Sequence, residues 1–60
     1  MNLKEFRKSK HVSQQEIADK LHTKQSNISR IEAGKVNPSL DFAIRYLDVL
    51  GYKLEVVKND

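Results

Sequence analysis

Residues 13–35 read SQQEIADKLHTKQSNISRIEAGK, and this stretch decides the fold of the chain. It contains two short amphipathic helix patterns separated by a tight break, Leu-His-Thr, at residues 21–23. The second pattern has apolar residues on one side and small polar or basic residues on the other. A helix of that kind, held across a first helix, fits the major groove of DNA.

The spacing of the apolar residues predicts four helices. They are expected over residues 2–10, 14–21, 24–33 and 40–50. Ser13 and Glu16 match a capping box at the start of the second helix. Gly34 is the left-handed cap expected after the third helix, while Ser39 caps the fourth and Gly51 stops it. The sequence therefore predicts a single all-α domain that spans residues 1–60.

The chain changes its period after the fourth helix. Tyr52, Leu54 and Val56 alternate with Lys53, Glu55 and Val57, and the run is rich in β-branched and aromatic residues, which predicts a short strand over residues 52–57. No other segment has a strand pattern, and a lone strand leaves its backbone groups unpaired. We therefore expect this strand to pair with the same strand of a second copy across a twofold axis.

The fourth helix carries two apolar stripes, more than one neighbour can bury. The first stripe consists of Leu40, Ala43, Ile44, Leu47 and Leu50. The second consists of Phe42, Tyr46 and Val49. We expect the first stripe to face the core of the domain and the second to face a partner copy. The predicted dimer interface is then Phe42, Tyr46, Val49, Tyr52, Leu54 and Val56. The alternative is that the second stripe covers the strand of its own chain.

Composition narrows the class of protein. The chain has 60 residues, no cysteine and a net charge of +3, so one domain without disulfides or thiolate metal sites is expected. Eight basic and four acidic residues lie in positions 1–35, against three basic and four acidic in positions 36–60. A basic front half suggests a side that faces a polyanion, although lysine-rich solubility is the plainer explanation. With no apolar run of membrane length and no signal peptide, a cytoplasmic protein with no membrane partner is expected.

Two charged residues fall on inward-facing sides of their helices. Glu32 lies near Ile28 around the third helix, and Arg7 lies near Leu3 around the first. A buried carboxylate without a partner is very costly. Arg7 and Glu32 are therefore predicted to form a bidentate ion pair that ties the two helices together. The alternative is two separate surface charges at an apolar edge.

Residues 3–50 resemble the helix-turn-helix domain of the phage repressor/Cro group, also called the xenobiotic-response-element family. The likeness lies in Gln14 opening the second helix, in Ala18, and in the string ISRIEAGK over residues 28–35. It implies a four-helix, lambda-repressor-like domain in which the family's Arg–Glu pair maps onto Arg7 and Glu32. The C-terminal strand is similar to that of small Hip-type antitoxins, whose strands pair across a homodimer.

The turn between the second and third helices departs from the family pattern. His22 stands where the family usually has glycine, because the position requires a positive φ. A modestly strained turn is expected there. His11 and His22 are not expected to bind a metal, since no carboxylates accompany them at ligand spacing.

The family's base-contacting positions map onto the outward side of the third helix. They are Lys24, Gln25, Ser26 and Arg30. Glutamine can pair bidentately with adenine, and lysine or arginine with guanine, although each side chain could instead be merely solvated. Contacts to the DNA backbone are expected from Gln14, Thr23, Asn27, Lys35, Asn37 and Ser39. Lys35 could also be a plain surface charge.

These features predict a dimeric, sequence-specific DNA-binding repressor that binds a palindromic operator. One form of it is the autoregulating antitoxin of a toxin–antitoxin pair, with a cognate toxin as protein partner. The alternative is a protein-interaction module that binds a partner such as a toxin or polymerase without reading bases. No catalytic residues, cofactor or metal are expected, because no nucleophile stands at readable spacing from a base and the body is too small to enclose a site.

Overall fold

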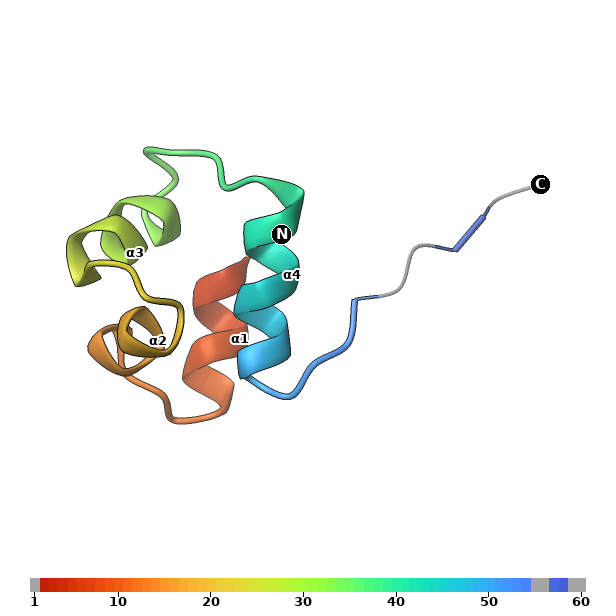
Figure 1. Ribbon diagram of the computed structural model, residues 1–60, viewed down its shortest axis with the longest axis horizontal. Helices are drawn as coiled ribbons and strands as arrows, with labels where there is room; N and C mark the ends of the chain where they lie inside the picture. Colours follow the sequence, from red (N-terminus) through yellow and green to blue (C-terminus); the bar gives the residue numbers. More distant parts are fainter. Residues whose placement is uncertain (1, 55–56, 59–60) are drawn as a thin grey trace.

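The computed structural model describes residues 2–54, 57 and 58 and contains four helices in that part of the chain. They are α1 (Leu3–Ser9), α2 (Gln14–Lys20), α3 (Gln25–Glu32) and α4 (Leu40–Val49). Each predicted helix boundary lies within one residue of the observed one. Figure 1 shows α1 and α4 side by side, with α2 and α3 forming the other half of the body.

Short polar side chains cap the starts of three helices. The Oγ atoms of Ser13 and Ser39 each accept a hydrogen bond of 3.0 Å, from the backbone N–H of Glu16 and of Phe42 respectively. Asn2 Oδ1 accepts one of 3.3 Å from the backbone N–H of Glu5 at the start of α1, a cap that the sequence pattern did not predict. These bonds satisfy amide groups that a helix start leaves without a partner, so they fix where the helices begin.

One apolar core joins all four helices. Its centre consists of Ile17, Ala18, Ile28 and Tyr46, each with 0% of its surface exposed. Leu3, Leu21, Leu47 and Leu50 complete the buried cluster. The small side chain of Ala18 lies on α2, which packs directly against α3. The apolar side of α3 thus packs against α2 and the core, and its opposite side is exposed to solvent.

The buried side of α4 differs from the one that the sequence predicts. Tyr46 is fully buried in the domain's own core, so its assignment to a partner-facing stripe is wrong. Phe42 and Val49 also pack, half-buried, against that core. Conversely, Leu40 and Ile44 are 61% and 40% exposed, although they were expected to face inward. The apolar residues of α4 occupy more than half of the helix circumference. Their spacing therefore does not show which part of that arc packs against α2 and α3.

The segment after α4 leaves the body as an extended arm on the side of α1 and α4 (Figure 1). Residues 52–54, 57 and 58 have no regular secondary structure, and no strand occurs in the described residues. A strand requires a neighbouring segment to complete its hydrogen-bond ladder, and the described part of one chain offers none. Val56 of the predicted interface lies outside the described residues.

Tyr52 anchors the arm at its base. Its ring meets that of Phe6 edge-on, with 5.0 Å between the ring centroids. Its hydroxyl shares a hydrogen bond of 2.8 Å with Ser9 Oγ, and Lys10 Nζ lies 4.9 Å from the ring centroid. Tyr52 and Leu54, both predicted dimer residues, are half-buried against their own domain.

None of the four helices is long and apolar enough to cross a membrane, as judged over the described residues.

Candidate nucleic-acid interface

A tight turn sets the angle between α2 and α3. His22 has a φ of +55°, so the predicted left-handed residue at this position is confirmed. The turn is closed by backbone hydrogen bonds from the N–H of His22 to Asp19 O (3.2 Å) and from that of Thr23 to Ala18 O (2.9 Å). His11 has a φ of +57° in the connection between α1 and α2, a left-handed residue that the sequence pattern did not predict. Both left-handed turns are therefore built without glycine, at a cost in backbone strain.

The side of α3 that faces away from the core is polar and basic. The predicted base-contacting residues Lys24, Gln25, Ser26 and Arg30 are all exposed. Ile28, in contrast, is fully buried on the opposite side. Ser26 and Arg30 lie roughly opposite Ile28 around the helix, so the core packing of Ile28 presents them to solvent. Gln25 in the first turn of α3 and Lys24 at its N-cap are exposed at the start of the helix.

A chain of side-chain hydrogen bonds runs from the protein interior to this exposed face. Gln25 Nε2 donates to Gln14 Oε1 across 3.3 Å. Gln14 Nε2 in turn donates to Oε1 of Glu32 across 3.2 Å. The Gln14 amide is thus engaged on both sides by protein groups. The hydrogen bond from Gln25 to Gln14 leaves one amide hydrogen and the side-chain carbonyl oxygen of Gln25 free. A bidentate contact with adenine uses one donor and one acceptor of this kind.

Glu32 lies at the centre of a polar cluster that also includes Arg7, Gln14 and Tyr46, hereafter the Glu32 cluster. The predicted ion pair is present: Arg7 Nε and Nη2 each donate to a different carboxylate oxygen, both at 2.8 Å. The Tyr46 hydroxyl donates to Oε2 across 2.6 Å. Arg7 Nη1 also donates to Val12 O across 2.7 Å. One carboxylate at the end of α3 therefore joins α3 to each of the other three helices.

The charges within the Glu32 cluster stabilise one another. Burial by itself would raise the pKa of the Glu32 carboxyl. Hydrogen bonds from Arg7, Tyr46 and Gln14 outweigh that effect and hold the pKa below its ordinary value. The hydrogen bond to Glu32 likewise raises the pKa of Arg7, against the opposing effect of burial. Both groups are therefore charged at neutral pH, as a bidentate pair requires.

The residues predicted to contact the DNA backbone occupy different environments. Thr23 and Asn27 are half-buried and bind each other, with Asn27 Nδ2 donating to Thr23 Oγ1 across 3.0 Å. Lys35 and Asn37 are exposed in the connection between α3 and α4. Ser39 is exposed as well, and its hydroxyl caps α4. The Thr23–Asn27 pair links the turn to the first turn of α3, a contact that the sequence pattern did not predict.

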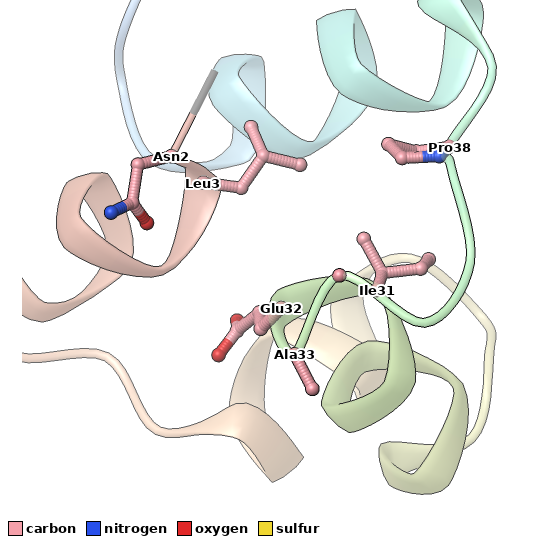
Figure 2. A pocket seen from close by; sticks show the side chains of 7 residues that line it. Asn2, Leu3, Ile31, Glu32, Ala33 and Pro38 are labelled. Atoms are coloured by element: carbon pink, nitrogen blue, oxygen red, sulfur yellow. The ribbon is translucent and has the colours of Figure 1, made fainter.

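A hollow of about 270 Å³ lies where the start of α1 approaches the end of α3. Figure 2 shows Glu32 on its lining, with Leu3 above and Ile31 and Pro38 to the other side. The carboxylate of Glu32 already accepts four hydrogen bonds from protein groups. The principal charged group on the lining therefore has little capacity left to bind a ligand.

Comparison with known proteins agrees with this geometry. The family model described as "Helix-turn-helix" matches residues 3–57. The chain is also similar to a protein of Archaeoglobus fulgidus named as an uncharacterized HTH-type transcriptional regulator. The two are 36% identical over 53 residues, which covers 88% of this chain and 75% of the relative. No solved structure matches the chain. The family match spans all four helices and hence the whole interface described above.

Proposed function

The chain belongs to the phage repressor/Cro type of helix-turn-helix family, and from that premise we propose that it is a dimeric, sequence-specific transcription repressor. Membership of this family makes it a DNA-binding regulator, in a class of domains that are not normally enzymes. The proposal adds three elements: a palindromic operator, a homodimer and repression as the outcome of binding. It places the protein in the cytoplasm, on the nucleoid.

The observation that carries the proposal is the orientation of Gln25 on the exposed face of α3. The side-chain oxygen of Gln14 accepts one amide hydrogen of Gln25, which orients the remaining donor and acceptor of the Gln25 amide relative to α3. A pre-oriented amide loses less entropy on binding a base edge than a freely rotating one. Arg30 and Lys24 supply exposed donors for guanine or phosphate on the same helix.

The second element is the homodimer. A helix-turn-helix unit of this kind reads a half-site, and a twofold dimer reads two half-sites about one helical turn apart. The extended arm supports a dimer because it projects from the body and carries Val57 81% exposed. We propose that residues 52–57 pair with the same segment of a second copy, which would give their backbone groups a ladder partner.

The resemblance of the arm to Hip-type antitoxins extends the proposal. In that form the protein represses its own gene and also binds a cognate toxin. The exposed basic side of α3 favours DNA binding over the alternative of a protein-interaction module that reads no bases. Finding the selected operator sequence in the promoter of the protein's own gene would support autoregulation. An operator found exclusively elsewhere would count against it.

The test is selection of bound duplexes from a random pool, with wild type compared with two variants. The wild-type protein should enrich a palindromic consensus. Arg30→Ala should lose discrimination at particular base positions. Lys35→Ala should weaken binding to all sequences alike and flatten its salt dependence. Failure of the wild type to enrich any sequence would reject base reading and favour the protein-interaction module.

A further inference from the structure

The outward side of α4 carries an apolar pair beside a charged pair. Leu40 and Ile44 are four residues apart, are 61% and 40% exposed, and therefore lie one above the other on the helix surface. Asp41 and Arg45 have the same spacing and are also exposed. Arg7–Glu32 is the one salt bridge found among the described residues, so neither Asp41 nor Arg45 has an ionic partner there.

This pattern is complementary to itself when two copies of α4 run antiparallel. A twofold axis lies midway between any two residues that face each other across it. If Leu40 faces Ile44 of the partner subunit, the axis crosses the helix at the level of position 42 along its length. If Asp41 faces Arg45 of the partner subunit, the axis crosses at the level of position 43. These positions are adjacent, so one axis places both pairs in contact, each of them twice.

Parallel packing of the same two helices would have the opposite effect. A parallel twofold pair sets each edge of the helix face against the opposite edge of the partner, so the Asp41–Arg45 edge would meet the partner's Leu40–Ile44 edge. The charged side chains would then be desolvated against apolar ones without ionic partners, which is unfavourable. The charges thus select the antiparallel arrangement, while Leu40 and Ile44 supply apolar surface to bury.

We propose that a second copy of this chain docks, antiparallel, against the face of α4 made by Leu40, Asp41, Ile44 and Arg45. The proposal rests on the proposed dimeric repressor and assigns its interface to a surface other than the predicted Phe42–Tyr46–Val49 stripe. The position fits the function. Asn37 and Ser39, predicted phosphate contacts, directly precede this face in the chain, and the arm leaves the body on the same side as α4 (Figure 1). A partner seated there stands beside the DNA-binding loop and within reach of the arm.

A charge-swap experiment tests this geometry. Arg45→Asp leaves two aspartates at positions 41 and 45, and Asp41→Arg leaves two arginines there. Each variant alone should raise the dissociation constant of the dimer by about tenfold, because attraction becomes repulsion in both ion pairs. Mixing the two variants should restore association as a heterodimer, with both pairs attractive. Sedimentation velocity measures the association, and native mass spectrometry identifies the heterodimer.

The control variant is Lys20→Glu, which reverses an exposed charge on α2, away from this face. It should dimerise as the wild type does. Circular dichroism melts of all variants establish that they are folded. Ile44→Lys, which removes an apolar contact and adds a charge, should also shift the chain towards monomer.

The outcomes separate this interface from the proposed function. If wild type dimerises and neither charge variant weakens the dimer, the α4 face is overturned while the dimeric repressor stands. If the wild type remains monomeric even on operator DNA, the dimer itself fails. Half-site binding, measured separately, then tells whether DNA reading survives. Weakened single variants without rescue on mixing would reject the antiparallel pairing.

Discussion

The hydroxyl of Tyr46 lies 2.6 Å from Oε2 of Glu32 and donates a hydrogen bond to it, joining α4 to the last residue of α3. Burial and the neighbouring carboxylate both raise the pKa of Tyr46, so the phenol keeps its proton and remains a donor. Tyr46 is therefore an internal anchor of α3.

Replacing this hydroxyl should destabilise the fold without affecting association. Tyr46→Phe removes a hydrogen bond to a charged acceptor and should lower the free energy of unfolding by about 1.5–3 kcal/mol, measured by urea denaturation. Tyr52→Phe is the matched control, because its hydroxyl bonds to Ser9 at an exposed site, and it should cost less than about 1 kcal/mol. A Tyr46→Phe protein of unchanged stability that no longer dimerised would restore the partner-facing prediction.

Removing Arg7 should have a larger effect. Arg7→Ala leaves the buried carboxylate of Glu32 without its ion-pair partner and also frees Val12 O, so a loss of about 3–5 kcal/mol is expected. Lys8→Ala changes an exposed charge on the same helix and serves as the control. Equal melting temperatures for the two variants would contradict the role given to the pair.

Glu32 should also make the fold sensitive to acid. Its pKa is lower in the folded chain than the ordinary value of 4.5, so the folded state favours the charged carboxylate. That stabilisation is fully present above the unfolded pKa and is lost as the pH falls through the folded one. Urea midpoints compared at about pH 6 and about pH 3 should show a smaller acid loss in Glu32→Gln than in wild type. An identical loss in both proteins would assign acid sensitivity to other carboxylates.

The Gln14–Gln25 contact predicts coupling between a residue on α2 and a base read by α3. Gln25→Ala should reduce discrimination at one base position, and Gln14→Ala should reproduce part of that loss. A double-mutant cycle on consensus DNA should give a coupling energy of about 0.5–1.5 kcal/mol. If Gln14→Ala instead weakens binding to every sequence equally, Gln14 acts as the predicted backbone contact and does not orient Gln25.

The two left-handed histidines give a simple stability test. Glycine adopts a positive φ without the steric cost that other residues incur, but it loses more entropy on folding. His22→Gly and His11→Gly should therefore be neutral or stabilising by up to about 1 kcal/mol in thermal melts. The control variants carry alanine at the same positions, because alanine retains the Cβ atom that makes a positive φ unfavourable. A destabilised glycine variant would reveal a structural contact made by the imidazole.

Local signals in the sequence determined the helices, and long-range packing determined what those signals missed. Ser13, Ser39 and Gly34 act within one turn of their helices, which is why the predicted boundaries lie so close to the observed ones. Arg7 and Glu32 were predictable because a buried charge demands an opposite one. The position of Tyr46 was not, since its environment depends on which edge of α4 the other helices cover.

The interface itself divides in the same way. The outward side of α3 follows from helical spacing, so its exposed residues were identified correctly. The Gln14–Gln25 and Thr23–Asn27 contacts depend on the angle between α2 and α3 and on side-chain rotamers, which spacing does not encode. The arm presents a different difficulty. An alternating pattern indicates that a segment can form a strand, but the strand forms only when a second segment is present to make backbone hydrogen bonds with it.

The Glu32 cluster also joins residues that lie far apart along the chain, from Arg7 to Tyr46. Tyr46 is its last member along the chain, whereas all of the predicted base-contacting residues lie at or before position 30. A nascent or truncated chain that stops before Tyr46 has the full set of recognition residues but lacks one donor to the buried carboxylate and most of α4. We therefore expect a chain that stops before Tyr46 to fold poorly and to bind DNA weakly, even though it retains those residues.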